Sequence, residues 1–180
     1  MKEIQICPEC GQPGVKVNSK AVKYNLKKSV SAKIDHKLKW NACINKDCRC
    51  SYYSGKQKYS IADMGTPLFY KDSSDNVPIC YCSDLTRSEI KNAVRKGKLT
   101  TGAVRKFTHK TSTGHCDKMN PLGKCCKQIL MKTIKDYVDV KPKIKWSSNK
   151  GILIFSMKHS VWSVALIELM TIILICDTFN

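Results

Sequence analysis

The sequence predicts an α+β protein: a small β-rich unit stapled through its cysteines, then a unit of short helices, then an apolar C-terminal helix. Three observations predict this organisation. Ten of the eleven cysteines fall into two groups, one within the first 50 residues and one between positions 80 and 126. Segments with helical periodicity accompany the second group, and the last 30 residues are strongly apolar. The eleven cysteines are counted in the 42% hydrophobic content, so fewer apolar side chains are left to form a core. Small cores of this kind usually need cross-links or bound metals.

The cellular compartment determines whether cysteines form disulfides or stay reduced. The N-terminal stretch "MKEIQICPEC" contains no apolar run of the kind that forms a secretory signal. We therefore expect a cytoplasmic protein, in which thiols stay reduced and disulfides are rare. Closely spaced cysteines in such a protein indicate metal ligands or redox groups.

The first group predicts a zinc site in a domain spanning residues 1–75. Cys7 and Cys10 are separated by two residues, and Cys43 and Cys48 by four. Zn²⁺ prefers four tetrahedral thiolates, and a two-residue gap lets two sulfurs of one tight turn reach the same ion. Gly11, with Gly14, supplies the permissive backbone that such a turn needs. Cys50 is either a spare thiol or a replacement for Cys48.

The second group contains five thiols for a site that needs four ligands. The one-residue gap between Cys80 and Cys82 is unusual for zinc, because alternating positions splay two side chains apart. A 2Fe-2S cluster is larger than a single ion and suits this gap. The remaining ligands are Cys116 and one of Cys125 or Cys126. A ligand role for His115 in place of a thiolate has no second histidine at matching spacing to support it.

Three helices are expected in this second domain, residues 76–141. The first starts at Thr86, has Glu89 in capping-box position, and ends at Gly97. The second covers "TTGAVRKF". The third covers "CCKQILMKTIKDYV", so the adjacent cysteines lie at its N-terminus, where the helix dipole stabilises thiolates. Its predicted buried stripe consists of Ile129, Leu130, Ile134 and Val138.

Four stretches together resemble the N-terminal domain of CopZ-type copper chaperones: "CPECG", "CINKDC" with the aromatic pair after it, "VPICYC" and "NPLGKCC". The resemblance covers residues 1 to about 138. It implies a mononuclear zinc site in the first half and a 2Fe-2S domain similar to bacterioferritin-associated ferredoxin in the second. The implied zinc ligands are Cys7, Cys10, Cys43 and Cys48. The implied cluster ligands are Cys80, Cys82, Cys116 and either Cys125 or Cys126.

The resemblance implies a one-electron carrier linked to copper handling, an accessory metal-binding protein rather than an enzyme. Family members with a copper domain carry an M-x-C-x-x-C loop, and residues 139–180 contain none. The sequence therefore does not predict whether this chain binds copper. The electron donor, the acceptor and the oligomeric state are not predicted.

The charge balance leaves two interpretations: the lysines form a solvated surface with no specific role, which is the favoured one, or they attract an acidic partner. Lysine and arginine total 32 against 14 acidic residues, a formal charge of +18. An acidic copper-handling or redox protein fits this charge, with the lysines raising the rate of encounter. The alternative function is a zinc-knuckle protein that binds nucleic acid, with aromatic rings stacking on bases. The candidate rings are Trp40, Tyr52, Tyr53 and Tyr59. Tyrosines beside a zinc knuckle more often shield it from water, so this alternative is less favoured.

The C-terminal segment, residues 142–180, changes character after Pro142. Residues 152–176 are long enough to span a bilayer but include Lys158, His159 and Glu168, which are costly at its centre. Three interpretations stay open: a membrane anchor, an apolar helix that packs on the protein or a partner, and a segment with no selected role.

Overall fold

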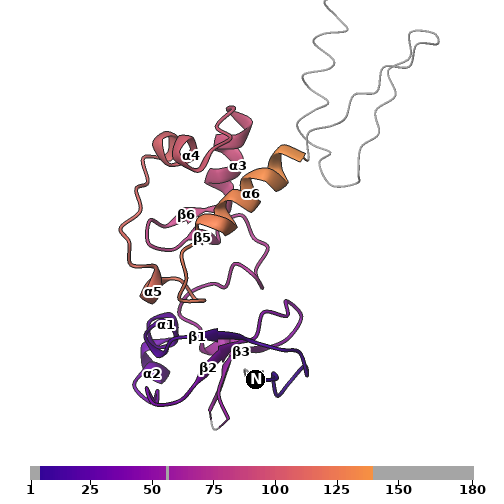
Figure 1. Ribbon diagram of the computed structural model, residues 1–180, viewed down its shortest axis with the longest axis vertical. Helices are drawn as coiled ribbons and strands as arrows, with labels where there is room; N and C mark the ends of the chain where they lie inside the picture. The colour runs from indigo at the N-terminus through magenta and orange to yellow at the C-terminus, as the bar shows by residue number, and fades with distance from the viewer. Residues whose placement is uncertain (1–4, 56, 140–180) are drawn as a thin grey trace, which may run out of the picture. The chain divides into compact units, whose positions relative to one another are not determined.

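The fold combines an antiparallel sheet with short helices, which confirms the predicted α+β class. A computed structural model describes residues 5–55 and 57–139 (Figure 1). The strands are β1 (Val15–Val17), β2 (Trp40–Ala42), β3 (Cys50–Tyr53), β4 (Lys58–Ser60), β5 (Pro78–Cys80) and β6 (Leu85–Thr86). The helices are α1 (Ser19–Asn25), α2 (Lys28–Ser31), the 3-10 turn η1 (Ile61–Asp63), α3 (Arg87–Arg95), α4 (Thr101–Thr108), α5 (Cys116–Met119) and α6 (Lys127–Asp139).

Two sheets organise the chain. Strands β1 to β4 form an antiparallel sheet in sequence order, and β5 pairs with β6 in a separate antiparallel ribbon. Figure 1 shows α1 and α2 beside the four-stranded sheet and α3, α4 and α6 gathered around the ribbon. Each cysteine group therefore belongs to a different sheet and a different set of helices.

The first core is built around α1 and the inner strands. Asn18 caps α1, because its side-chain oxygen accepts a 2.7 Å hydrogen bond from the backbone N–H of Ala21. Val22 then faces inward and is fully buried together with Trp40 and Tyr52. This core fixes β2 and β3, the strands on either side of the loop that carries Cys43 and Cys48.

The predicted capping box of α3 is present. The backbone N–H of Thr86 donates to the Glu89 carboxylate at 2.8 Å, and the N–H of Glu89 donates to the Thr86 hydroxyl. Ile90 and Val94 are buried on one face, as their spacing predicts, and Gly97 has a positive φ of 76° just after the helix. Helix α3 thus starts and stops where the sequence predicts.

Helix α6 buries the centre of its predicted stripe. Leu130 and Ile134 are buried in the second core, and Ile129 and Val138 pack against it half-buried. The helix begins at Lys127, so both adjacent cysteines precede it. Cys126 is nevertheless part of the same core.

Hydrogen bonds join the two halves of the described chain. The buried hydroxyl of Tyr52 donates to the carbonyl of Pro121 at 2.7 Å, and the Asn18 amide donates to the carbonyl of Asp117 at 2.9 Å. Tyr52 and Asn18 lie in the first half, whereas Asp117 lies in α5 and Pro121 in the loop between α5 and α6. The cysteines of the second group are thereby held near the first core.

The predicted C-terminal segment, residues 142–180, lies outside the described residues, as does the candidate anchor at 152–176. In the part of the chain that the structure describes, no helix is both long and apolar enough to cross a membrane.

Candidate metal centres

The first two cysteines lie on a tight loop before β1. The backbone N–H of Cys7 donates to the carbonyl of Gln12 at 2.8 Å, and the N–H of Gly11 donates to the carbonyl of Cys7 at 3.0 Å. Gly11 has a φ of 67°, a conformation that favours glycine. The predicted permissive backbone is therefore used at Gly11, and the turn places both sulfurs on the same side.

Gly14 serves a different purpose from the one expected. A Cβ atom at this position would lie 2.1 Å from the Tyr53 hydroxyl oxygen and 3.1 Å from the carbonyl oxygen of Ala42. The Tyr53 hydroxyl donates to the carbonyl of Gln5 at 2.8 Å. Gly14 thus leaves room for the tyrosine that joins β3 to the N-terminal loop.

The other two cysteines stand at the ends of the loop between β2 and β3. The N–H of Cys43 donates to the carbonyl of Ser51 at 2.9 Å, which continues the sheet, and the N–H of Cys48 donates to the carbonyl of Asn45 at 3.3 Å. The loop 43–48 therefore turns back on itself. This return brings the sulfur of Cys48 alongside that of Cys43.

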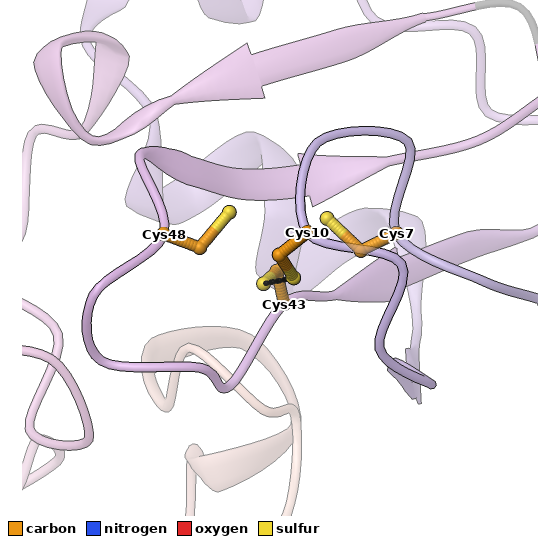
Figure 2. Close-up of side chains that lie close together, drawn as sticks. All are labelled: Cys7, Cys10, Cys43 and Cys48. Atoms are coloured by element: carbon orange, nitrogen blue, oxygen red, sulfur yellow. Dashed lines mark hydrogen bonds between the residues drawn. The ribbon is translucent and has the colours of Figure 1, made fainter.

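The four sulfurs of Cys7, Cys10, Cys43 and Cys48 all lie within 4.8 Å of one another. Figure 2 shows the four side chains pointing toward one another, with 3.7 Å between the sulfurs of Cys10 and Cys43. Cys10 is half-buried and the other three are buried. Four converging thiols fit the tetrahedral, fully occupied shell of a structural zinc ion, which leaves no coordination position for a substrate.

Burial opposes ionisation of these thiols in the absence of a metal. It raises the pKa of Cys43 to about 12, although the charge of nearby Lys71 acts in the opposite direction. Cys10 behaves differently, because the hydrogen bond from the Gln12 backbone lowers its pKa to about 7. A bound metal has to displace the thiol protons, so metal binding and proton release are coupled here.

Cys50 lies apart from the converging set. It is fully buried on β3, and its thiol donates to the carbonyl of Tyr52 over 3.8 Å. Burial raises the pKa of this thiol above its ordinary value. The geometry favours the spare-thiol interpretation of Cys50 over a role in place of Cys48.

The second cysteine group converges more loosely. The sulfurs of Cys80 and Cys82 are 3.7 Å apart, and those of Cys82 and Cys116 are 3.9 Å apart. Cys126 belongs to the same buried cluster as Cys80 and Cys82. Cys125 is exposed, whereas Cys126 is only 2% exposed and belongs to the surrounding core. Among the described residues, only the first group places three or more such ligand atoms within 4.8 Å of one another.

An arginine that the sequence did not single out reaches the second group. Arg105 on α4 donates from Nη2 to the sulfur of Cys80 at 3.1 Å and from Nη1 to the Ser83 hydroxyl at 3.4 Å. Hydrogen bonds from Cys126 and, more weakly, from Ser83 and Arg105 lower the pKa of Cys80 to about 4. The neighbouring Cys80 thiol and burial raise the pKa of Cys126.

His115 precedes α5 and is exposed. The aromatic residues of the nucleic-acid alternative are mostly inaccessible. Trp40, Tyr52 and Tyr53 are at most 2% exposed, and half-buried Tyr59 stacks on the Trp40 ring at 5.5 Å between centroids. These rings form the core and cannot stack on bases in this structure.

Comparison with known proteins agrees with the geometry of the first group. Residues 4–64 match a family model, zf_CopZ, described as a zinc binding domain, and this range contains all four converging cysteines. Residues 4–64 are thus similar to a CopZ-type zinc-binding domain. Its donor set is sulfur only, which suits zinc.

Two longer similarities extend past this domain. A curated relative, the copper chaperone CopZ of Archaeoglobus fulgidus, is 27% identical over 124 residues, which is 67% of this chain and 57% of the relative. The chain therefore spans little more than half of that protein. The X-ray structure of the A. fulgidus CopZ N-terminal domain is also similar, with a TM-score of 0.60 and 26% identity over 71% of this chain and 96% of that structure.

Proposed function

We propose that this protein is a metal-binding redox protein that carries one zinc ion and one 2Fe-2S cluster and transfers single electrons in copper handling. The zinc ion would be held by Cys7, Cys10, Cys43 and Cys48. The cluster would be held by Cys80, Cys82, Cys116 and Cys126. Residues 1–75 and 76–141 would form the two corresponding domains, each with its own core and its own metal group.

The observation that carries the proposal is the contrast between the two cysteine groups. The first is tight enough for one ion. In the second, neighbouring sulfurs are 3.7 and 3.9 Å apart, yet the set as a whole is wider than the first. The ligands of a two-iron cluster bind two different metal ions, so they spread in this way. Cys80, Cys82 and Cys126 lie in an apolar core, which keeps water from the group they would bind.

The two sites would have different roles, one in electron transfer and one in stabilising the fold. When bound, a 2Fe-2S cluster supplies one-electron chemistry, whereas Zn²⁺ has no redox chemistry and stabilises the fold. Arg105 places a positive charge against the Cys80 sulfur and would offset the negative charge of the cluster thiolates. Cys116 is the half-buried member of the four and marks the side on which a redox partner would approach.

The copper-handling partner is inferred from the similarity to a protein named as a copper chaperone. The formal charge of +18 favours a partner with an acidic docking surface. Raising the salt concentration should slow electron transfer to such a partner, because screening weakens the long-range attraction. A transfer rate that does not depend on salt would remove the acidic-partner part of the proposal.

Serine substitution in each group tests the two-site arrangement. In anaerobically prepared protein, Cys82→Ser should abolish visible absorption and iron while zinc stays bound. Cys43→Ser should release zinc and retain the visible absorption, provided that the second domain folds by itself. Zinc and iron are counted by elemental analysis, and each variant is the control for the other. Loss of both metals from both variants would contradict two independent sites.

A further inference from the structure

The segment between η1 and β5 connects to the loop of the first metal site through a lysine. Lys71 is half-buried, and its Nζ atom donates to the carbonyl of Asn45 at 2.5 Å and to that of Cys48 at 2.9 Å. Both acceptors belong to the loop 43–48, which carries two of the four converging cysteines. Lys71 lies outside the range that matches the zinc-binding domain, residues 4–64.

The ammonium group closes this loop. The carbonyl of Asn45 also accepts from the backbone N–H of Cys48, so Lys71 binds at the point where the loop turns back. An ammonium offers three donors and no acceptor, and bonds from a charged donor are stronger than those between neutral groups. Four thiolates around Zn²⁺ carry a net charge of about −2. Lys71 brings a positive charge to that loop and fixes the path of its backbone.

An arginine in turn holds the backbone before and after Lys71. Arg87 on α3 donates to the carbonyls of Phe69, Asp72 and Ser74 at 2.7 to 3.0 Å. These carbonyls lie on both sides of Lys71 in the chain. The guanidinium group of a helix in the second half therefore fixes the backbone from which Lys71 reaches the first metal site.

We propose that Lys71 is a positioning residue of the zinc site and that Arg87 holds it in place, so that zinc retention in the first domain depends on a helix of the second. The proposal rests on the zinc assignment made above. Loss of a partner that orients a metal ligand commonly costs about 10- to 100-fold in metal affinity. We expect an effect of that size from Lys71 and a smaller effect of the same kind from Arg87.

The experiment follows zinc transfer from the zinc-loaded full chain to a chromophoric chelator. Lys71→Met removes the charge and the donors while keeping the length of the side chain, and should speed zinc loss about tenfold or more. Lys71→Arg retains charge and donors and should recover most of the retention. Lys46→Met is the matched control, because Lys46 is an exposed lysine of the same loop whose charge is removed without touching either carbonyl bond.

Arg87→Met tests the connection to α3. It should speed zinc loss, and the double variant should lose zinc no faster than Lys71→Met alone, because both act through one path. Circular dichroism at saturating zinc checks that each variant folds. If Lys71→Met releases zinc at the same rate as Lys46→Met, Lys71 does not position the zinc site. If the effects of the two substitutions add in the double variant, Arg87 does not act through Lys71. A chain that binds no zinc at all would instead contradict the zinc assignment.

Discussion

At the scale of single residues, chemically equivalent cysteines differ in what their surroundings allow. Cys125 and Cys126 are adjacent in the sequence and indistinguishable by spacing, yet only Cys126 enters the core beside Cys80. In the first group, Cys48 joins the converging sulfurs while Cys50, two residues later, bonds to a carbonyl. Burial and the direction of each side chain, which spacing does not reveal, distinguish these neighbouring thiols.

Serine substitution separates the two adjacent cysteines. We expect Cys126→Ser to lose most of the iron and visible absorption, because it removes the buried thiol that lies in the same core as Cys80. Cys125→Ser should bind iron as the unaltered chain does, because Cys125 is exposed. Iron content after anaerobic purification measures both. Equal losses in the two variants, or loss only in Cys125→Ser, would show that the fourth ligand is not Cys126.

Substitution of Arg105 should change the reduction potential of the cluster. Its guanidinium donates to the Cys80 sulfur, and a positive hydrogen-bond donor beside a cluster thiolate favours the reduced, more negative state. Arg105→Gln should therefore lower the potential, and Arg105→Lys should lower it less. Lys106→Gln removes an equal charge from an exposed position on the same helix and should change the potential little. Potentiometric titration of the visible spectrum gives the comparison, and an unchanged potential in Arg105→Gln would refute the role.

At the scale of elements, the sequence predicts local structure well where one short motif sets it. The Thr86 and Glu89 capping box and the buried stripe of α6 are confirmed because each depends on neighbouring residues alone. The roles of Arg105 and Lys71 could not be foreseen, since each reaches residues more than 20 positions away in the chain. Nothing in a lysine-rich sequence distinguishes a lysine that caps a loop from one that faces water.

Two glycine substitutions test how tightly the N-terminal loop packs. Gly14→Ala should destabilise the protein by about 1–3 kcal/mol, because the added methyl group overlaps the Tyr53 hydroxyl and approaches a strand carbonyl. Gly102→Ala is the control: it lies in α4 with open space around its Cβ position, and should stabilise by about 0.5–1 kcal/mol. Denaturant unfolding of metal-loaded protein measures both. If Gly14→Ala leaves the free energy of unfolding unchanged, the loop can move to make room for the methyl group and is not tightly packed.

At the scale of the whole molecule, the described chain has two sulfur centres in two cores that are tied together by hydrogen bonds. Tyr52 bonds to the loop before α6, and the segment held by Arg87 reaches the first centre through Lys71. The sequence predicts both centres and their order along the chain. It does not predict these connections, because they form between residues whose pairing only the tertiary fold brings about. Hydrogen bonds between the two cores add to the stability that a metal bound in each core would supply.

If the two centres hold different metals, the metal and sulfide content of the purified protein reveals both. Zinc, iron and acid-labile sulfide are counted per chain in protein purified without oxygen and without added metal. We expect one zinc, two irons and two sulfides, with the absorption of a 2Fe-2S cluster in the visible range. A chain that contains zinc alone, with neither iron nor sulfide, would contradict this expectation.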